Sequence, residues 1–267
     1  RVLCLTAPGA GPPRGPHAGR PMITFPGSPA GGRRIGAAAG GAVKRVALEL
    51  GGKSASVVLP GADHAEAVAG SVASVMFNSG QRCNALTRVL VRADRYEEAV
   101  ALAAKAVEKY PAGDRIGPLV SAAQRDRVVS YIEKGLAEGA RIVAGGSRPP
   151  LERGYYVAPT VFADVTPDMT IAREEIFGPV VAFLRYEDEE DALRIANGTP
   201  YGLAGAVWGE PGAAAAFARR MEAGQVDVNG GRFNPLAPFG GYKQSGIGRE
   251  LGAHGLAEYL HTKSLQF

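Results

Sequence analysis

A cysteine in a short polar segment is the residue of this chain best suited to covalent chemistry. Cys83 lies within residues 78–85 (NSGQRCNA), between a stretch with helical spacing of apolar residues and a β-rich run. Inert cysteines are commonly buried in apolar elements, whereas a reactive thiol sits in a polar loop that reagents can reach. A thiol with a pKa of about 8.5 needs a base or a positive potential to form the nucleophilic thiolate. Cys83 is therefore the candidate nucleophile.

Three other patterns do not have the spacing that their chemistry needs. Residues 52–54 (GKS) are similar to the end of a phosphate-binding loop, but Ala47 stands where the glycine that opens such a loop would be. The glycine-rich stretch 36–41 lacks the dinucleotide-binding spacing and follows no convincing strand. No metal site is expected, because the histidines are isolated from one another and from carboxylates: His64, His254 and His261.

The elements that must position Cys83 alternate between β-rich and helical stretches from Met22 onward. Capping signals at Asp63 and Ser121 predict helix starts, and a further helix is expected from the acidic run 187–191 to Gly198. Such alternation is typical of βαβ units with a parallel sheet, so the predicted fold class is α/β. Strands are expected at 47–50, 55–59, 88–91, 141–144, 180–184, 204–207 and 225–228.

Composition narrows the class of protein. The 267 residues are 46% apolar and 21% charged, which is ordinary for a soluble globular protein. The net charge of +4 is spread among acids, so nucleic-acid binding is not expected. The sequence has no apolar run of about 18 residues and no secretory signal, so no membrane association is expected and a cytoplasmic location is the default. Two cysteines cannot make a disulfide framework.

Five motifs, in order over about residues 22–267, resemble the aldehyde dehydrogenase superfamily. They are FPGS with GR at 25–28 and 32–33, ELGGKS at 49–54, GQRC at 80–83, EEIFGPV at 174–180, and PFGGYKQSG with GRE at 238–246 and 248–250. Five ordered matches are much more specific than any one of them. The chain thus resembles the C-terminal catalytic portion of an NAD(P)-dependent enzyme, with a parallel-sheet catalytic domain and a remnant of the Rossmann-like cofactor domain.

The resemblance implies oxidation of a small aldehyde to a carboxylic acid with NAD or NADP. Cys83 would add to the carbonyl carbon to give a thiohemiacetal, whose collapse transfers hydride to the nicotinamide and leaves a thioester. Glu49 would be the base that activates the thiol and then deprotonates the water that hydrolyses the thioester.

The same resemblance implies a set of cofactor-binding residues. Glu175 would hydrogen-bond the nicotinamide ribose, and Phe177 would pack beside it. Ser28, next to Gly27 at a helix start, would bind the pyrophosphate. The backbone at Leu50 and Gly51, followed by a second glycine, would allow close approach of the nicotinamide region.

Four segments are expected along the chain. Residues 1–21 are predicted to be an unstructured, mis-framed leader, 22–50 a remnant of the cofactor domain, 51–250 the catalytic domain, and 251–267 a C-terminal segment. Within the last segment, residues 259–267 are predicted to form an extended strand that resembles the family's oligomerisation strand. A homo-dimer or homo-tetramer is therefore the expected assembly.

Two other functions remain open from the sequence. The chain could be a catalytically incompetent fragment that retains only subunit association, or a weak cysteine-dependent esterase. Aldehyde-dependent nicotinamide reduction would support the dehydrogenase, and ester hydrolysis abolished by Cys83→Ala would support the esterase.

Overall fold

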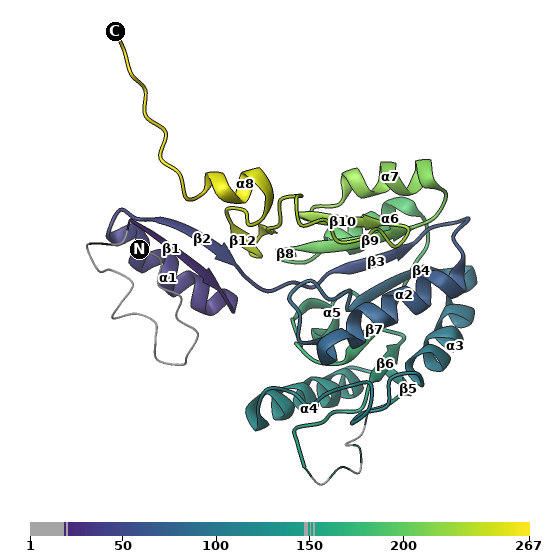
Figure 1. Ribbon diagram of the computed structural model, residues 1–267. Coiled ribbons are helices and arrows are strands. Elements are labelled where there is room, and N and C mark those ends of the chain that lie inside the picture. Colours follow the sequence, from purple (N-terminus) through teal and green to yellow (C-terminus); the bar gives the residue numbers. More distant parts are fainter. Residues whose placement is uncertain (1–18, 20, 147–148, 150, 152) are drawn as a thin grey trace. The chain divides into compact units, whose positions relative to one another are not determined.

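The computed structural model describes residues 19, 21–146, 149, 151 and 153–267 (Figure 1). The predicted leader lies almost entirely outside the described residues. The chain divides into two compact units: unit 1 contains the residues up to Gly51 together with Phe233–Phe267, and unit 2 contains Gly52–Arg232. The first boundary lies one residue from the predicted one at 50/51. The second differs, because residues 233–250, expected in the catalytic domain, pack with the N-terminal segment instead.

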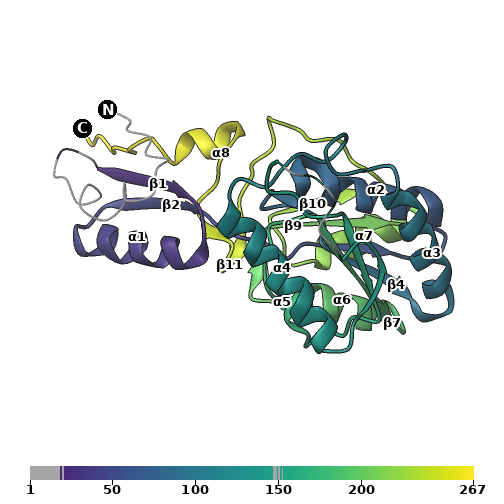
Figure 2. The same cartoon turned by 90° about the horizontal axis from the view of Figure 1, so that it is seen from below.

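Unit 1 is built on one βαβ crossover. Its first two strands are parallel, from the pair Met22 and Arg45 to the pair Pro26 and Glu49. The short strand β12 lies antiparallel on the other side of β2. Figure 2 shows α1 lying along the β1–β2 pair, where Ile35 of the helix packs with Leu48. The elements are β1 (Met22–Pro26), α1 (Pro29–Gly41), β2 (Arg45–Glu49), β11 (Tyr242–Lys243), β12 (Gly246–Ile247) and α8 (Gly252–Ala257).

Unit 2 contains a seven-stranded sheet in the order β10-β9-β3-β4-β7-β6-β5. All neighbouring pairs are parallel except β5 and β6. The sheet strands are β3 (Ala55–Val58), β4 (Arg88–Arg92), β5 (Arg141–Ala144), β6 (Thr160–Ala163), β7 (Val180–Tyr186), β9 (Ala204–Trp208) and β10 (Gln225–Val228), and the two-residue β8 (Tyr201–Gly202) precedes β9. The predicted α/β class is confirmed.

Helices cover both faces of this sheet (Figure 1). One apolar cluster joins Val57 and Leu90 to buried residues of α4, α6 and α7, and a second joins Val58 and Val89 to α2 and α3. Successive strand residues therefore serve opposite faces, as the two-residue period requires. The helices are α2 (His64–Met76), α3 (Tyr96–Val107), α4 (Ala122–Ala137), α5 (Thr170–Arg173), α6 (Glu189–Asn197) and α7 (Pro211–Arg220), with 3₁₀ turns η2 (Phe77–Gly80) and η3 (Ala93–Arg95).

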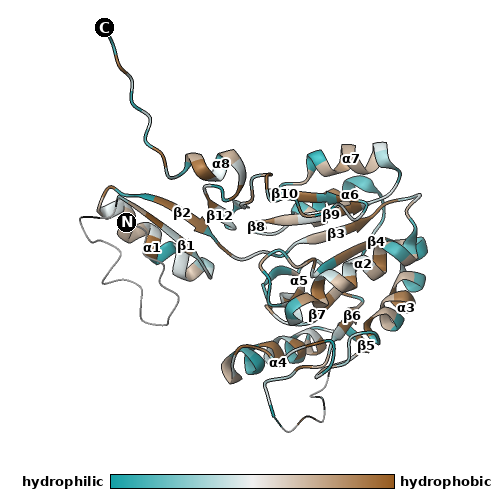
Figure 3. Ribbon diagram, in the orientation of Figure 1, coloured by the Kyte–Doolittle hydropathy of each residue, from teal (hydrophilic) through white to brown (hydrophobic). Residues whose placement is uncertain are grey.

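Hydropathy follows this layering. Figure 3 shows apolar residues along the strands of the unit 2 sheet and both colours on α3, as expected for a helix with one face on the core. Within the described ranges, no helix combines the length and the apolar character needed to cross a membrane.

The predicted helix starts are present. Asp63 caps α2 by accepting a hydrogen bond from the Glu66 amide, and Ser121 caps α4 by accepting one from the Gln124 amide. The helix predicted from the acidic run is α6, and Gly198 follows its last residue. The seven predicted strands are also found, with ends shifted by at most two residues.

Two expectations need correction. The first is one of kind: the glycine-rich stretch 36–41 is helical, as the second half of α1, and its start lies ten positions after the end of β1. Residues 259–267 are not a strand in the structure. A strand needs a backbone partner, whereas the Tyr259 and Leu260 amides donate to carbonyls of Leu256 and Ala257 and extend the last turn of α8.

Candidate active site

Three loops at one edge of the unit 2 sheet carry the predicted residues of that unit. Gly52 precedes β3, Cys83 precedes β4, and the segment with Glu175 and Phe177 precedes β7. These three strands are parallel neighbours in the sheet, so the loops that enter them meet at its amino edge. The fold thus gathers residues that are far apart in the sequence.

The Cys83 loop has an unusual backbone. Cys83 is half-buried and follows a turn in which Asn78, Ser79 and Gly80 have φ values of 51°, 55° and 72°. A Cβ atom on Gly80 would lie 1.9 Å from the carbonyl oxygen of Gly178, so only glycine fits there. This contact locks the Cys83 loop onto the segment that carries Glu175 and Phe177.

Gly52 connects the Cys83 loop to Glu175, whose carboxylate is predicted to bind the cofactor. Its amide donates a hydrogen bond of 3.1 Å to Oε1 of Glu175. A Cβ atom on Gly52 would lie 2.4 Å from the carbonyl oxygen of Cys83, so the backbone of the predicted nucleophile packs against this glycine. In this structure, Gly52 therefore allows its own loop to approach the Cys83 loop closely.

Helix α4 holds the backbone beside Phe177. The amide Nε2 of Gln124 donates hydrogen bonds to the carbonyl oxygens of Ile176, at 3.1 Å, and Phe177, at 2.8 Å. Phe177 has a φ of 60°, a conformation that a residue with a side chain adopts only when its surroundings enforce it. The capping signal at Ser121 predicted the start of this helix, but this role of Gln124 was missed.

Two further side chains of α4 hold the paired acids. Arg127 donates to the carbonyl oxygen of Glu175 at 2.8 Å, and the Tyr131 hydroxyl donates to Oε2 of Glu174 at 2.7 Å. Burial, more than this hydrogen bond, raises the pKa of Tyr131 to about 12, so the hydroxyl remains a donor at neutral pH. The spacing of Gln124, Arg127 and Tyr131 along one helix face is the signal that could have revealed these contacts.

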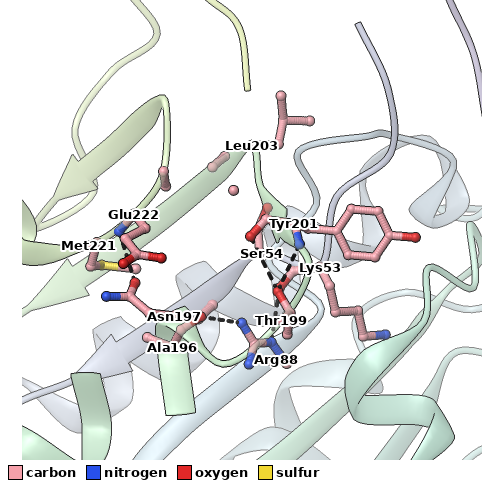
Figure 4. A pocket seen from close by; sticks show the side chains of 14 residues that line it. Lys53, Ser54, Arg88, Ala196, Asn197, Thr199, Tyr201, Leu203, Met221 and Glu222 are labelled. Atoms are coloured by element: carbon pink, nitrogen blue, oxygen red, sulfur yellow. Dashed lines mark hydrogen bonds between the residues drawn. The ribbon is translucent and has the colours of Figure 1, made fainter. Parts of the chain in front are cut away.

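A buried arginine braces the loop that begins at Gly52. Arg88 donates to the carbonyl oxygens of Lys53, at 2.9 Å, and of Ile195 and Ala196, both at 2.7 Å, the latter two at the C-terminal end of α6. Burial lowers the pKa of Arg88 to about 10, so it stays charged. Figure 4 shows the guanidinium directed at Ala196, in a hollow that Lys53 and Ser54 also line.

Unit 1 brings the other predicted residues to one edge of its own strands. Gly27 and Ser28 follow β1, while Leu50 and Gly51 follow β2, and the Gly27 amide donates to the carbonyl oxygen of Glu49 at 2.9 Å. Because β1 and β2 are parallel, these residues share the carboxyl edge. Ser28 is also the N-cap of α1, where its Oγ accepts from the Gly31 amide at 3.2 Å.

Glu49 has the environment of a base. Its side chain is 8% exposed, and its Oε2 accepts no hydrogen bond from any described residue. Burial and the neighbouring Glu250 raise the pKa of Glu49 to about 7, against a smaller opposing effect of Arg249. A Cβ atom on Gly240 would lie 2.9 Å from Oε1 of Glu49, so this glycine leaves room for the carboxylate. Such a group is partly ionised at neutral pH, as a general base requires.

The segment around Ser245 fixes the backbone beyond Glu49. The Ser245 carbonyl oxygen accepts from the Leu50 amide at 2.9 Å, and its Oγ donates to the Gly51 carbonyl oxygen at 2.7 Å. The surrounding motif was matched to the family from the sequence, but Ser245 was not singled out. Its place in the matched KQSG motif was the available signal.

The structure thus assembles two groups of predicted residues. Cys83 lies with the Glu175–Phe177 segment in unit 2, and Glu49 lies with the other four predicted cofactor residues in unit 1. The fold and the five motifs together define an α/β protein of the aldehyde dehydrogenase type.

Comparison with known proteins gives the family directly. The sequence matches the model of the aldehyde dehydrogenase family over residues 13–265, a match that starts before Met22. The chain belongs to the aldehyde dehydrogenase family.

Two relatives show the degree of similarity. Geranial dehydrogenase of Castellaniella defragrans is 47% identical, over 93% of this chain and 53% of that protein. The 3-succinoylsemialdehyde-pyridine dehydrogenase of a Pseudomonas species is 44% identical, over 97% of this chain and 56% of that protein. The chain therefore spans about half the length of the curated relatives it matches.

Solved structures agree with this assignment. A mutant of aldehyde dehydrogenase C from Pseudomonas syringae, in complex with NAD+ and octanal, superposes with a TM-score of 0.91 at 45% identity, covering 93% of this chain and 53% of that one. A Mycobacterium tuberculosis aldehyde dehydrogenase in complex with NAD+ gives a TM-score of 0.87 at 48% identity, covering 90% and 51%.

Proposed function

We propose that this chain supplies the catalytic thiol, the general base and part of the cofactor site of an NAD(P)-dependent oxidation of aldehydes to carboxylic acids. The observation that carries the proposal is the junction at Gly52. One backbone position packs against the Cys83 carbonyl and donates to the Glu175 carboxylate, so the nucleophile and the cofactor residue are held by the same loop.

The chain's own groups fit a nicotinamide cofactor. Oε1 of Glu175 accepts the Gly52 amide, while Oε2 accepts no hydrogen bond from the described residues and can take one from a ribose hydroxyl. At the start of α1, Ser28 and the first-turn amides offer donors to a pyrophosphate. When bound, NAD(P)+ would accept the hydride that leaves the substrate carbon.

Each protein group then has a stated task. The Cys83 thiolate forms a bond from sulfur to the carbonyl carbon, and loss of hydride from that carbon leaves a thioester. Glu49 takes the thiol proton and releases it to solvent, and it later takes a proton from the water whose oxygen attacks the thioester, so that the acid and the Cys83 thiolate are released. A pKa of about 7 allows Glu49 to accept and release protons at neutral pH.

The names of the relatives narrow the first substrates to try. Geranial and octanal are apolar aldehydes, and the other relative named above is a semialdehyde dehydrogenase. We infer that medium-length aliphatic aldehydes belong at the head of the panel, with semialdehydes next. Association of two or more copies through residues 259–267 is part of the same proposal, with NAD and NADP both as candidate cofactors.

The experiment uses the purified chain with NAD+ and NADP+ in turn. Aldehyde-dependent nicotinamide reduction that Cys83→Ala abolishes is the expected result. Cysteine-dependent ester hydrolysis without nicotinamide reduction would replace the dehydrogenase proposal with the esterase. The absence of both activities, together with a self-associated chain in sedimentation, would leave the subunit-association function.

A further inference from the structure

Lys53 carries a buried ammonium group that the proposed chemistry does not use. The residue is 2% exposed, and its Nζ makes no hydrogen bond with any described residue. It directly follows Gly52, whose amide holds Glu175, and its carbonyl oxygen is fixed by Arg88. Figure 4 shows the Lys53 side chain ending away from the Arg88 guanidinium. The Lys53 side chain thus belongs to the loop whose Gly52 amide binds the Glu175 carboxylate.

The charges around Lys53 differ in sign. Burial and Arg88 disfavour the protonated amine and lower the pKa of Lys53 to about 7, while Glu175 and then Glu174 favour it. Seen from the other side, burial raises the pKa of Glu175, and the Gly52 amide, Lys53 and Arg127 oppose this rise. The lysine and Glu175 therefore support each other's ionised forms.

We propose that Lys53 is a positioning residue whose buried ammonium keeps Glu175 ionised and seated on the Gly52 amide, so that its second oxygen can accept a hydroxyl of the cofactor ribose. The cofactor part of this inference rests on the proposed function, and the electrostatic coupling of Lys53 to Glu175 stands without it.

Packing alone does not explain a lysine at this place. A buried ammonium without a hydrogen-bond partner is strongly unfavourable, and a methionine of similar length would fill the same space without that penalty. Replacing a buried ion by an apolar residue is often neutral or stabilising for the fold. A purely structural lysine and a charge-positioning lysine therefore predict opposite results for Lys53→Met: a weaker fold in the first case, and a weaker hold on the cofactor without a weaker fold in the second.

The first experiment needs no cofactor. The side-chain signals of ¹³C-labelled lysine are titrated by NMR, with the Lys53 signal assigned by its loss in Lys53→Met. In Glu175→Gln the Lys53 titration midpoint should fall, because a favourable negative neighbour is gone, and in Glu174→Gln it should fall less. Glu108→Gln, a change of an exposed acid directly after α3, is the matched control and should leave the midpoint in place. An unchanged midpoint in Glu175→Gln would overturn the proposal.

The second experiment measures cofactor binding. Lys53→Met should weaken NAD+ binding by about 5- to 30-fold, while the thermal midpoint stays the same or rises. In the Glu175→Gln background the same change should have little effect on binding, since the partner is gone. Equal losses in both backgrounds would contradict the pairing. If the wild-type chain binds neither NAD+ nor NADP+, the proposed function fails, and the NMR titration still decides whether Lys53 is coupled to Glu175.

Discussion

The two units of this chain place their functional side chains at opposite ends of parallel strands. In unit 1, Glu49 is the last residue of β2 and the Gly27–Ser28 pair follows β1, at the carboxyl edge where α/β sheets usually bind ligands. In unit 2, Cys83 and Glu175 precede their strands, at the amino edge. The difference shows that a parallel sheet does not by itself decide where a site forms.

The physical basis of the two edges also differs. The carboxyl edge of unit 1 offers the amides at the start of α1, a feature that any strand-to-helix connection supplies. The amino edge of unit 2 has no such ready group, so its loops are interlocked through glycine contacts at Gly52 and Gly80 and through the side chains of α4. Substitutions in unit 2 should therefore act mainly by changing the geometry of its loops. Substitutions in unit 1 should act mainly by changing the charge at its carboxyl edge.

The largest effect is expected at the nucleophile of unit 2. Cys83→Ala should reduce aldehyde-dependent nicotinamide reduction by about 10⁴-fold or more, because the sulfur that forms the covalent bond is gone. Its circular dichroism spectrum should match that of the wild type, since Cys83 is only half-buried. Activity within ten-fold of wild type would show that the thiol is not the nucleophile.

A smaller but large loss is expected for the base of unit 1. Glu49→Gln should lower the rate by about 10²- to 10⁴-fold. The wild-type rate should rise with pH through about 7, as Glu49 loses its proton, and the variant should lack this rise. Glu250→Gln is the sharper test: it removes a negative neighbour, lowers the pKa of Glu49 and should move the rise to lower pH. A rise unaffected by either change would exclude Glu49 as the titrating base.

Glu49 should also affect stability with a defined sign. Its pKa is raised above the ordinary value of 4.5, so the folded state holds the proton more tightly than the unfolded state between these two values. The wild-type contribution is fully present below pH 4.5 and is lost as the pH rises through about 7. The melting temperature of Glu49→Gln, relative to wild type, should therefore increase from pH 5 to pH 8. A constant difference would contradict the raised pKa.

The interlocking of unit 2 is tested by Gly80→Ala. The new methyl group would meet the Gly178 carbonyl at 1.9 Å in addition to the unfavourable φ of 72°, so we expect a loss of about 3 kcal/mol in the free energy of unfolding. Gly139→Ala is the matched control, with a φ of 97° and no atom within 4 Å of the new group, and should lose only about 1 kcal/mol. If urea denaturation gives equal losses of unfolding free energy for the two variants, the close contact with Gly178 does not contribute to the effect of Gly80→Ala.

Helix α4 provides a finer test of the same edge. Gln124→Leu removes the donor to the Ile176 and Phe177 carbonyls and should destabilise the chain by about 1 to 2 kcal/mol while raising the KM for the cofactor. Ser121→Ala removes the cap of the same helix, at about 1 kcal/mol, and should leave that KM unchanged. A rise in KM for both variants would point to the helix as a whole.

The smallest effect is expected at Ser28 in unit 1. Ser28→Ala should lose about 1 kcal/mol of stability with its cap on α1. Ser28→Asp keeps a capping oxygen but brings a negative charge to the proposed pyrophosphate position, so its stability should be retained while cofactor binding weakens. Unaltered cofactor binding in the aspartate variant would show that the pyrophosphate does not bind at this helix end.

Sequence patterns predicted strands better than they predicted connections. The seven expected strands are β-rich runs between turn residues, and this local signal survives folding. Helix α1 was expected only from the family resemblance, which places a helix start at Ser28, because its glycines are poor helix formers and give no helical pattern of their own. Its packing depends on their small size, since a Cβ atom on Gly32 would lie 2.6 Å from the Leu50 side chain. Strand β6 escaped because it is short and follows Pro159.

The motifs predicted which residues belong to the candidate site, but not the contacts between them. Gly52 and Glu175 are 123 positions apart, and nothing local in either segment shows that one donates to the other. Lys53 was considered only as part of a phosphate-binding loop, because its burial arises from the tertiary packing around it. Contacts of this kind depend on which strands become neighbours, which spacing along the chain does not reveal.

The glycine contacts at Gly52 and Gly80 also bear on how such a site can be altered. At both positions an added Cβ atom would collide with a carbonyl oxygen, so backbone packing fixes the Cys83 loop together with the side-chain hydrogen bonds of Asn78, Ser79 and Gln81. A side chain at either glycine would push these backbone segments apart. A redesign of this site therefore has to leave both glycines in place.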